Sequence, residues 1–182
     1  MFDTVRCEKL DSMQPEQTSE ESTLRQVYRL RVLAFKADGL IPPSLSSSAE
    51  SWRDEHDEHA IHWVVQREGV VVAAARICIH QALDQVPDAQ LFIDTGISAE
   101  PPIACFNRLV IAPSERGKGV SGKLDSVRID EAVRLGCKFA VAWTHNPKRI
   151  KPVQDLGFRL IEYARHPTAE QFSRVAVFMR RF

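Results

Sequence analysis

The chain has 182 residues, of which 44% are hydrophobic and 26% are charged, a composition typical of a soluble globular protein rather than a disordered or fibrous one. Lysine plus arginine (24) balances aspartate plus glutamate (24), so no net charge favours binding to nucleic acid or anionic lipid. The N-terminal sequence MFDTVRCEKL is partly acidic and has no apolar stretch, and no run of about 18 apolar residues follows. We therefore expect neither a signal peptide nor a membrane span, and a cytoplasmic location.

The domain organisation follows from length and local composition. Residues 1–20 are polar without periodicity, so we expect a flexible N-terminal tail there and one compact domain over 21–182. Four cysteines are scattered without a C-x-x-C pair: Cys7, Cys78, Cys105 and Cys137. This spacing indicates reduced, mostly buried thiols rather than a disulfide framework or a zinc site.

The first half of the domain predicts a helix followed by a hairpin. In STLRQVYRLRVLAFKADG the apolar residues form one stripe at helical spacing; Ser22 or Thr23 would cap its start, and Gly39 would end it. The Pro/Ser-rich segment LIPPSLSSSAESW predicts a loop long enough to cover a substrate. The β-rich runs AIHWVVQ and VVVAAARICIH flank REG, which predicts a hairpin with Gly69 in the turn. Residues 81–100 are acidic and predict no regular element.

The second half predicts strands that alternate with helices. IACFNRLVIA is a buried strand that ends at Pro113, and a glycine-rich stretch then opens a helix from Val120 to Leu135, capped by Gly136. CKFAVAWTH predicts a second buried strand, PKRIKPVQDLG a short helix, and FRLIEYA and RVAVFMRRF two closing strands. This order indicates a single α/β domain with a mixed, mostly antiparallel central sheet flanked by helices.

The stretch ERGKGVSGKL, residues 115–124, matches parts of three phosphate-binding signatures. A dinucleotide loop begins directly at the end of its strand, with an acid about 20 residues on; here APSER intervenes and FAVAWTH has no acid. A P-loop needs Ser or Thr after its lysine, where this chain has Leu124. The third signature, [RQ]-x-x-G-x-[GA] of coenzyme A acyltransferases, is close to RGKGVS, and a helix N-terminus after such a loop suits a pyrophosphate.

The segments RLVIAPSERGKGVSGKL and NPKRIKPVQDLGF together resemble the core of the GNAT superfamily of acyl-CoA N-acyltransferases, over roughly residues 104–160. In that family the pantetheine arm of the cofactor pairs with the central strand and its pyrophosphate lies on the loop amides. The resemblance therefore implies acetyl-CoA or another acyl-CoA as co-substrate. It implies a cofactor site formed by Leu109, Val110, Ile111, Arg116, Gly117, Lys118, Gly119, Val120, Ser121, Gly122 and Asn146.

Two positions depart from the pattern of the superfamily. Ser121 stands where glycine or alanine is usual, and serine is small enough for the loop to close. Val153 occupies the usual place of the tyrosine that protonates the departing thiolate, so another residue or water would have to do so. The backbone N–H near Val110 would polarise the thioester carbonyl while an amine attacks it.

The N-terminal half resembles one branch of this fold, the acyl-homoserine-lactone synthases and N-acyl amino acid synthases, through the spacing of RVLAF, DEHD and two later arginines. Cys105 stands where that branch carries a catalytic glutamate, and a thiol is a poor base at its usual pKa. We consider Asp57, Asp54 and His145 as candidate catalytic groups. For an acceptor that bears a carboxylate, the candidate binding residues are Arg31, Arg76 and Arg108.

Structural roles compete with each of these assignments. Arg76 and Arg108 could neutralise the two aspartates in a structural network, and His145 could be a structural hydrogen-bonding residue. His56, His59 and His62, spaced by three, raise the alternative of a metal site. On a helix the third would leave the shared face, and on a strand the first two would point to opposite sides. We therefore expect a solvated loop there and no metal.

The expected function is transfer of an acetyl or other acyl group from acyl-CoA to a primary amine of a small molecule, by a GNAT-type N-acetyltransferase. A long-chain N-acyl amino acid synthase is one alternative, favoured by the N-terminal spacing. A non-catalytic acyl-CoA-binding module is another, because the usual tyrosine and glutamate are absent. The expected partners are the amine and acyl-CoA, without nucleic acid or membrane, and a homodimer is one alternative for the assembly. The acceptor and the acyl chain length stay open.

Overall fold

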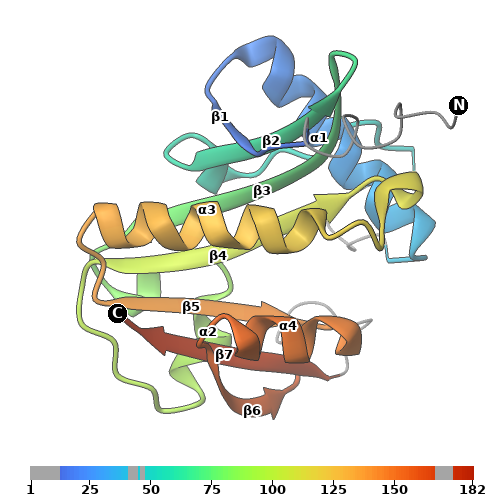
Figure 1. Cartoon of the computed structure of the whole chain (residues 1–182). Coiled ribbons are helices and arrows are strands. Elements are labelled where there is room, and N and C mark those ends of the chain that lie inside the picture. The colour runs from blue at the N-terminus through green and yellow to red at the C-terminus, as the bar shows by residue number, and fades with distance from the viewer. Residues whose placement is uncertain (1–12, 41–44, 46–47, 167–173) are drawn as a thin grey trace, which may run out of the picture.

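The central feature of the computed structural model, which describes residues 13–40, 45, 48–166 and 174–182, is a single sheet (Figure 1). Its seven strands are ordered β1-β2-β3-β4-β5-β7-β6. They are β1 (Glu16–Thr18), β2 (Ile61–Arg67), β3 (Val70–His80), β4 (Ile103–Ile111), β5 (Phe139–Thr144), β6 (Arg159–Ala164) and β7 (Val175–Arg181). Neighbouring strands are antiparallel except β4 and β5, which are parallel. The predicted mixed, mostly antiparallel sheet is confirmed.

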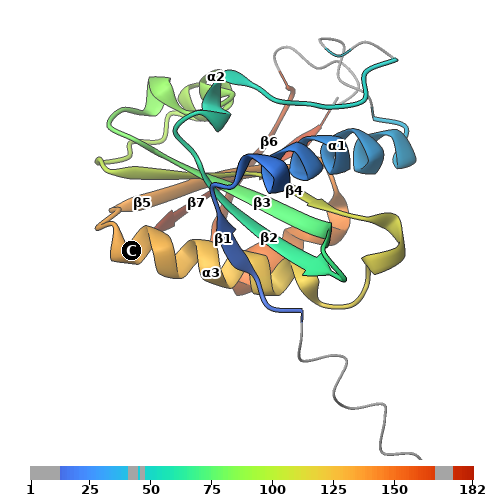
Figure 2. The ribbon, with the colours of Figure 1, turned by 90° about the horizontal axis from the view of Figure 1, so that it is seen from above.

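Helices cover both faces of this sheet. They are α1 (Glu21–Ala37), α2 (Ala89–Ile93), α3 (Val120–Arg134) and α4 (Ile150–Asp155). Seen from above in Figure 2, α1 and α2 lie on one face while α3 lies on the other, and Figure 1 places α4 on the same side as α3. The strand–helix–strand unit β4–α3–β5 explains the single parallel pair, because a crossover helix is needed to bring the chain back in the same direction.

The core follows the two-residue period of the strands. Cys105 and Val141 pack on the face of α2, whereas Phe106 and Ala142 pack on the face of α3 and α4. Successive side chains of a strand point to opposite faces, so strands buried on both sides are apolar throughout. The continuous apolar runs that predicted β4 and β5 are therefore explained by coverage on both faces.

The predicted helix at the N-terminal end is confirmed, but its start differs. α1 begins two or three residues earlier than expected, with Glu20 rather than Ser22 or Thr23 at the N-cap position. Both hydroxyls instead donate to the Glu20 carboxylate, at 2.5 and 3.2 Å. Because the hydroxyls are engaged with a side chain, they do not cap backbone N–H groups. Gly39 ends the helix as predicted, with φ of 69°.

Two segments expected to lack regular structure contain short elements. β1 lies within the segment expected as a tail and pairs with β2, and Met13 before it is buried. α2 lies within residues 81–100, and its Leu91 and Phe92 are buried in the core. Neither element has enough residues to show periodicity, so tertiary contacts decide both. Residues 1–12 of the expected tail, and positions 41–44 and 46–47 of the Pro/Ser-rich loop, lie outside the described residues.

The parallel strands β4 and β5 separate partway along their length. They pair only from Ile103–Phe106 with Phe139–Ala142. Beyond Phe106, the edge of β4 that faces β5 has no strand partner, while its other edge continues to pair with β3 up to Ile111. An unpaired strand edge leaves backbone N–H and C=O groups open to another extended segment.

Candidate active site

A cavity of about 750 Å³ lies where β4 and β5 separate. Residues 106–111 of β4 form one wall, and residues 142–149 of β5 and the following turn form another. α1 contributes Ala34, Phe35 and Asp38, and α3 contributes Asp125 and Arg128. The cavity therefore reaches both faces of the sheet through the gap between the two strands.

A β-bulge at Arg108 shapes the β4 wall. Ala74 pairs with Val110 and Arg76 with Asn107, so two residues of β4 lie opposite one residue of β3. Arg108 itself has φ of 52°, a left-handed conformation that costs of order 1–3 kcal/mol for a residue other than glycine. Its guanidinium is held by Asp54 Oδ2 at 2.9 and 2.7 Å and stacks 4.1 Å above the Trp52 ring. These contacts offset the strain and fix the arginine at the cavity wall.

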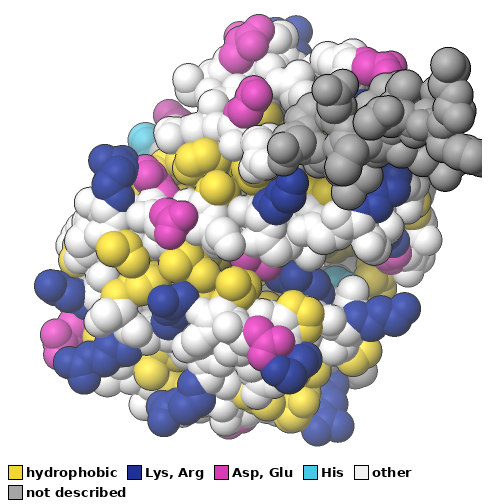
Figure 3. Space-filling view, viewed as in Figure 1, with side chains coloured by type: hydrophobic (Ala, Val, Ile, Leu, Met, Phe, Trp, Pro, Cys, Tyr) yellow, Lys and Arg dark blue, Asp and Glu magenta, His cyan; other side chains and the backbone are white. Residues whose placement is uncertain are grey.

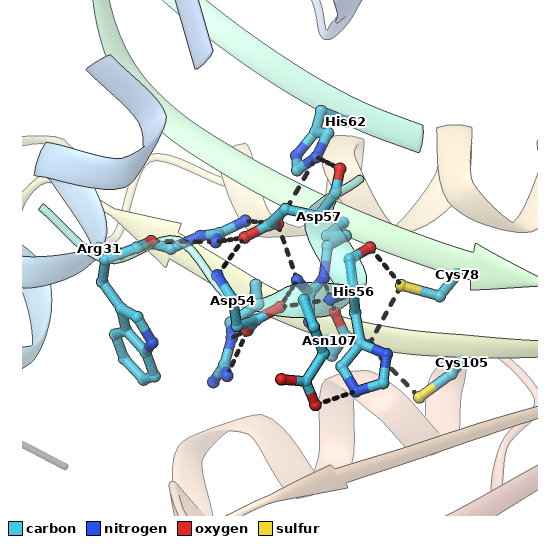
Figure 4. A network of polar contacts seen from close by, with 12 residues as sticks. Arg31, Asp54, His56, Asp57, His62, Cys78, Cys105 and Asn107 are labelled. Atoms are coloured by element: carbon cyan, nitrogen blue, oxygen red, sulfur yellow. Dashed lines mark hydrogen bonds and ion pairs between the residues drawn. The ribbon is translucent and has the colours of Figure 1, made fainter. Parts of the chain in front are cut away.

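Three arginines from three different elements converge on two aspartates. Figure 4 shows Arg31, Asp54 and Asp57 within this network. Arg31 of α1 binds Asp57 through two hydrogen bonds of 2.7 and 2.8 Å. Arg76 of β3 bridges Asp54 and Asp57, and Arg108 completes the chain at Asp54. The network carries one positive charge in excess, so it can accept one further anion without repulsion.

Local structure prepares the aspartates for this role. They lie at the N-cap and third position of the 3-10 turn η2 (Glu55–Asp57), where each carboxylate accepts a backbone N–H of the turn. Burial alone would raise the pKa of Asp57, but the hydrogen bonds and charges of Arg31 and Arg76 outweigh it and lower the pKa. The pKa of Asp54 is lowered in the same way by Arg76 and Arg108, again against burial. Both carboxyls are ionised at neutral pH.

The network extends to two thiols through Asn107. The Asn107 amide oxygen accepts from Arg76 Nε at 2.6 Å, and its Nδ2 lies 3.4 Å from Cys105 Sγ and 3.9 Å from Cys78 Sγ. Burial and, to a smaller extent, the charge of Cys78 raise the pKa of Cys105 to about 12, although Asn107 and Arg76 act in the opposite direction. Cys105 is therefore a protonated thiol at neutral pH, in agreement with the prediction of reduced, mostly buried thiols. Cys78, Cys105 and Cys137 are free and buried, while Cys7 lies outside the described residues.

The candidate acceptor-binding residues fall into two groups. Arg76 and Arg108 line the cavity, whereas Arg31 is fully buried behind them and does not line it. Asp54 and Asp57 also lie behind the wall, where they contact the arginines. Arg76 Nη2 is buried and has no hydrogen-bond partner among the described residues.

The glycine-rich loop lies at one end of the cavity. Gly117 and Gly119 have φ of 78° and 75°, conformations that favour glycine, and Gly119 is the N-cap residue of α3. Arg116 and Gly117 line the cavity together with Leu109, Val110, Ile111 and Asn146, whereas residues 118–122 lie outside its wall.

The two basic side chains of this loop are occupied by acidic partners. Arg116 binds Asp38 through two hydrogen bonds of 2.6 and 3.1 Å, and Lys118 Nζ lies 3.0 Å from Glu115. Backbone N–H groups at the start of α3 are therefore the candidate donors for an anion at this loop, although Gly122 N–H already donates to Gly119 O at 3.1 Å.

His145 and Val153 line the cavity on the β5 side. Burial lowers the pKa of His145, against a smaller opposite effect of Asp38, so the imidazole is neutral at pH 7. Asn146 caps a 3-10 turn by accepting the Lys148 N–H at 3.0 Å. In the part of the chain that the structure describes, no three His, Cys, Asp or Glu residues form a group that could hold a metal, the three histidines of DEHDEHAIH included.

Arg128, Asn107 and Asp88 belong to this site although the sequence did not single them out. Arg128 is buried and donates to the backbone carbonyls of Arg76 and Asn107, at 3.2 and 3.4 Å, so it supports the bulge. A charged residue on the apolar stripe of the α3 sequence could have signalled it. Asp88 lies in a loop, and no sequence pattern marks it.

Charged side chains of both signs occur on the face of the molecule that Figure 3 shows. In the face shown in Figure 3, acidic side chains lie among the basic ones rather than apart from them. Among the described helices, none has the length and apolar character needed to cross a bilayer.

Fold and comparisons with known proteins define the class: this is an acyltransferase of the GNAT fold. More narrowly, the model of the family "N-acyl amino acid synthase FeeM" matches residues 26–180, and the chain belongs to that family. The resemblance inferred from the sequence is confirmed, and the family match supports the N-acyl amino acid synthase alternative better than simple acetyl transfer. No curated protein sequence matches the chain.

Solved structures share the fold at low sequence identity. FeeM, an N-acyl amino acid synthase from uncultured soil microbes, has a TM-score of 0.64 and 13% identity, over 90% of this chain and 93% of its own. The CoA-dependent acyl-homoserine lactone synthase BjaI has a TM-score of 0.68 and 16% identity, over 92% and 82%. A putative N-acetyltransferase from Lactobacillus plantarum has a TM-score of 0.64 and 13% identity, over 93% and 97%.

Proposed function

We propose that the protein is an N-acyl amino acid synthase, which transfers an acyl group from its coenzyme A thioester to the α-amino group of an amino acid. Family membership supports this proposal, and one observation carries it: the arginine network at the cavity wall has one positive charge in excess. Among the three arginines, Arg108 has the guanidinium group that remains partly exposed, whereas the side chains of Arg31 and Arg76 are fully buried. Arg108 Nη1 donates to no described residue, so it is available to an acceptor carboxylate.

The thioester would bind along the unpaired edge of β4. Leu109, Val110 and Ile111 line the cavity there, and an extended pantetheine arm can pair with the backbone groups of this edge as an added strand would. The pyrophosphate would then lie on backbone amides between residues 116 and 122, at the start of α3. Asn146 faces the same cavity from the β5 side.

The reaction would form one C–N bond and break one C–S bond. The neutral amine attacks the thioester carbon, a backbone N–H near Val110 stabilises the developing oxyanion, and the thiolate departs. One such donor is worth about 3–4 kcal/mol. The neutral imidazole of His145 accepts the proton that the nitrogen releases. Asp54 and Asp57 have lowered pKa values and bound arginines, so their role is to hold Arg76 and Arg108 in place.

Acylation of matched acceptors tests the function. Purified protein is incubated with acyl-CoAs of two to sixteen carbons and with amino acids, each paired with the amine that lacks the carboxylate; products are identified by mass spectrometry. We expect N-acyl amino acids, with kcat/KM lower by at least about tenfold for each paired amine, which corresponds to ~1.4 kcal/mol. Equal rates with the amines would overturn the proposal in favour of a simple amine acetyltransferase. Acyl-CoA binding without turnover would favour a non-catalytic module.

A further inference from the structure

Asp88 is a carboxylate of the cavity wall that takes no part in the arginine network. It lies just before α2 with φ of 57°, a left-handed conformation that aspartate tolerates better than most residues. Trp143 Nε1 donates to Asp88 Oδ2 at 3.0 Å, and His166 Nε2 lies 3.5 Å from Asp88 Oδ1. Two side chains from distant parts of the chain therefore hold this carboxylate in one orientation.

The Asp88 carboxylate is both ionised and accessible. Its side chain is 31% exposed, whereas that of His166 is 5% exposed. Burial would raise the pKa of Asp88, but the hydrogen bond and charge of His166, the hydrogen bond from Trp143 and the charge of Arg108 outweigh it and lower the pKa. Each carboxylate oxygen has a second lone pair that can accept a hydrogen bond from a ligand.

Asp88 and Arg108 face the same cavity without neutralising each other. The charge of Arg108 acts on Asp88, yet the described contacts include no ion pair between them, and Arg108 binds Asp54 instead. Opposite charges that stand apart in one cavity match a ligand that carries both charges.

We propose that Asp88 binds the α-ammonium group of the acceptor while Arg108 binds its α-carboxylate. This inference rests on the proposed function and specifies the acceptor as an α-amino acid with both charges present. Charge-assisted hydrogen bonds to each end are roughly twice as strong as neutral ones, so both groups contribute to selection. After the ammonium group has released one proton to solvent water, Asp88 also orients the neutral amine that attacks the thioester, by accepting a hydrogen bond from it.

The test compares three ligands that differ by one charge: an amino acid, the carboxylic acid that lacks its amino group, and the amine that lacks its carboxylate. Calorimetry with the full chain measures the affinity of each in the presence of coenzyme A. We expect the amino acid to bind the wild-type protein at least about tenfold more tightly than either analogue, or ~1.4 kcal/mol. Absence of any preference over the deaminated acid would overturn the proposal without any variant.

Two substitutions test separately the binding of the amino group and of the carboxylate of the ligand. Asp88→Asn keeps the shape and can still accept from Trp143, so we expect it to abolish the preference for the amino acid over the deaminated acid. Arg108→Gln should abolish the preference over the amine. Asp84→Asn, an exposed carboxylate four residues upstream, is the control and should leave all three affinities unchanged. Wild-type discrimination in Asp88→Asn would overturn the assignment of Asp88.

Turnover distinguishes this inference from the proposed function. If no amino acid is acylated with any acyl-CoA, the proposed function fails. If amino acids are acylated and Asp88→Asn leaves their KM and kcat unchanged, only the role of Asp88 fails. We expect the KM of Asp88→Asn for the amino acid to rise at least about tenfold while its KM for acyl-CoA stays the same.

Discussion

At the scale of single residues, charge pairing away from solvent is the dominant feature. Arg31, Arg76 and Asp57 have side chains with no exposed surface, and each depends on the others for neutralisation. Removing one member of such a group leaves a buried charge without its partner, which is far costlier than the net stabilisation that the pair provides. We therefore expect the network to hold the side chain of Arg108 in place, and to add little net free energy to the stability of the fold.

Arg31→Met tests this support. Arg31 does not line the cavity, so its loss acts through Asp57 and should lower the free energy of unfolding by about 3–5 kcal/mol. Denaturation by urea, followed by circular dichroism, measures the change. Arg25→Met on the same helix removes an exposed pair with Glu21 and is the matched control, expected to leave the midpoint unchanged. Equal midpoints in the two variants would contradict the structural role.

Acid should weaken the folded state through the same residues. Asp54 and Asp57 have a pKa below the ordinary value when folded, so their contribution is complete above about pH 4, the unfolded pKa, and is lost as pH falls through the folded pKa. Free energies of unfolding measured from pH 7 to pH 3 should therefore fall most steeply below pH 4. Asp57→Asn should be less stable at pH 7 and show a shallower decline; a parallel decline would assign the acid sensitivity to other carboxyls.

At the scale of elements, the loop before α3 depends on backbone conformation. Gly119 has positive φ at the N-cap position, whereas Gly122 lies inside the helix without positive φ. A Cβ atom would meet no atom within 4 Å at either glycine, so space does not distinguish them. The two positions differ in backbone strain, because a residue other than glycine would be strained at Gly119 and not at Gly122.

Alanine substitutions at these two glycines should therefore have opposite effects. Gly119→Ala should lower the stability by about 1–2 kcal/mol because of left-handed strain. Gly122→Ala should raise it by up to about 1 kcal/mol because alanine favours the helix. Thermal unfolding measures both. Gly119→Trp should in addition abolish acetyl-CoA binding, and an unchanged affinity would contradict the placement of the pyrophosphate on this loop.

At the scale of the whole molecule, one topological event creates the site. The parallel pair β4 and β5 separates after Phe106 and Ala142, and α1, β3, α3 and the turn after β5 all contribute to the resulting cavity. Ligand binding at such a gap joins the two halves of the sheet, because β5, β7 and β6 are connected to the other strands through β4 alone. Stability and binding should therefore be strongly coupled.

Acyl-CoA should accordingly raise the melting temperature. A ligand that binds only the folded state at 100 times its dissociation constant stabilises it by about 2.7 kcal/mol. For a chain of this length, that corresponds to a rise of roughly 5–11 °C. Adenosine 3′-phosphate 5′-diphosphate, which keeps the pyrophosphate of coenzyme A but lacks the pantetheine arm, is the control at the same concentration and should give a smaller rise. An equal rise with both ligands would argue against pairing of the arm with β4.

The sequence by itself determined the long elements and the class of the fold. The apolar runs of β3, β4 and β5 and the stripe of α1 are long enough for periodicity to identify them, and the spacing around the glycine-rich loop indicated the superfamily. It also brought Arg31, Asp54, Asp57, Arg76 and Arg108 forward as candidates. It did not determine that three of them lie behind the wall while Arg76 and Arg108 face the cavity.

Only the tertiary structure decided the geometry of the site. The bulge at Arg108, the unpaired edge of β4 and the position of Asp88 beside Trp143 each depend on contacts between segments tens of residues apart. Local sequence patterns report on preferences within one turn or one strand, whereas burial and charge pairing depend on which segments meet. For this reason the elements and several candidate residues could be predicted from the chain, but which of the charged side chains line the cavity could not.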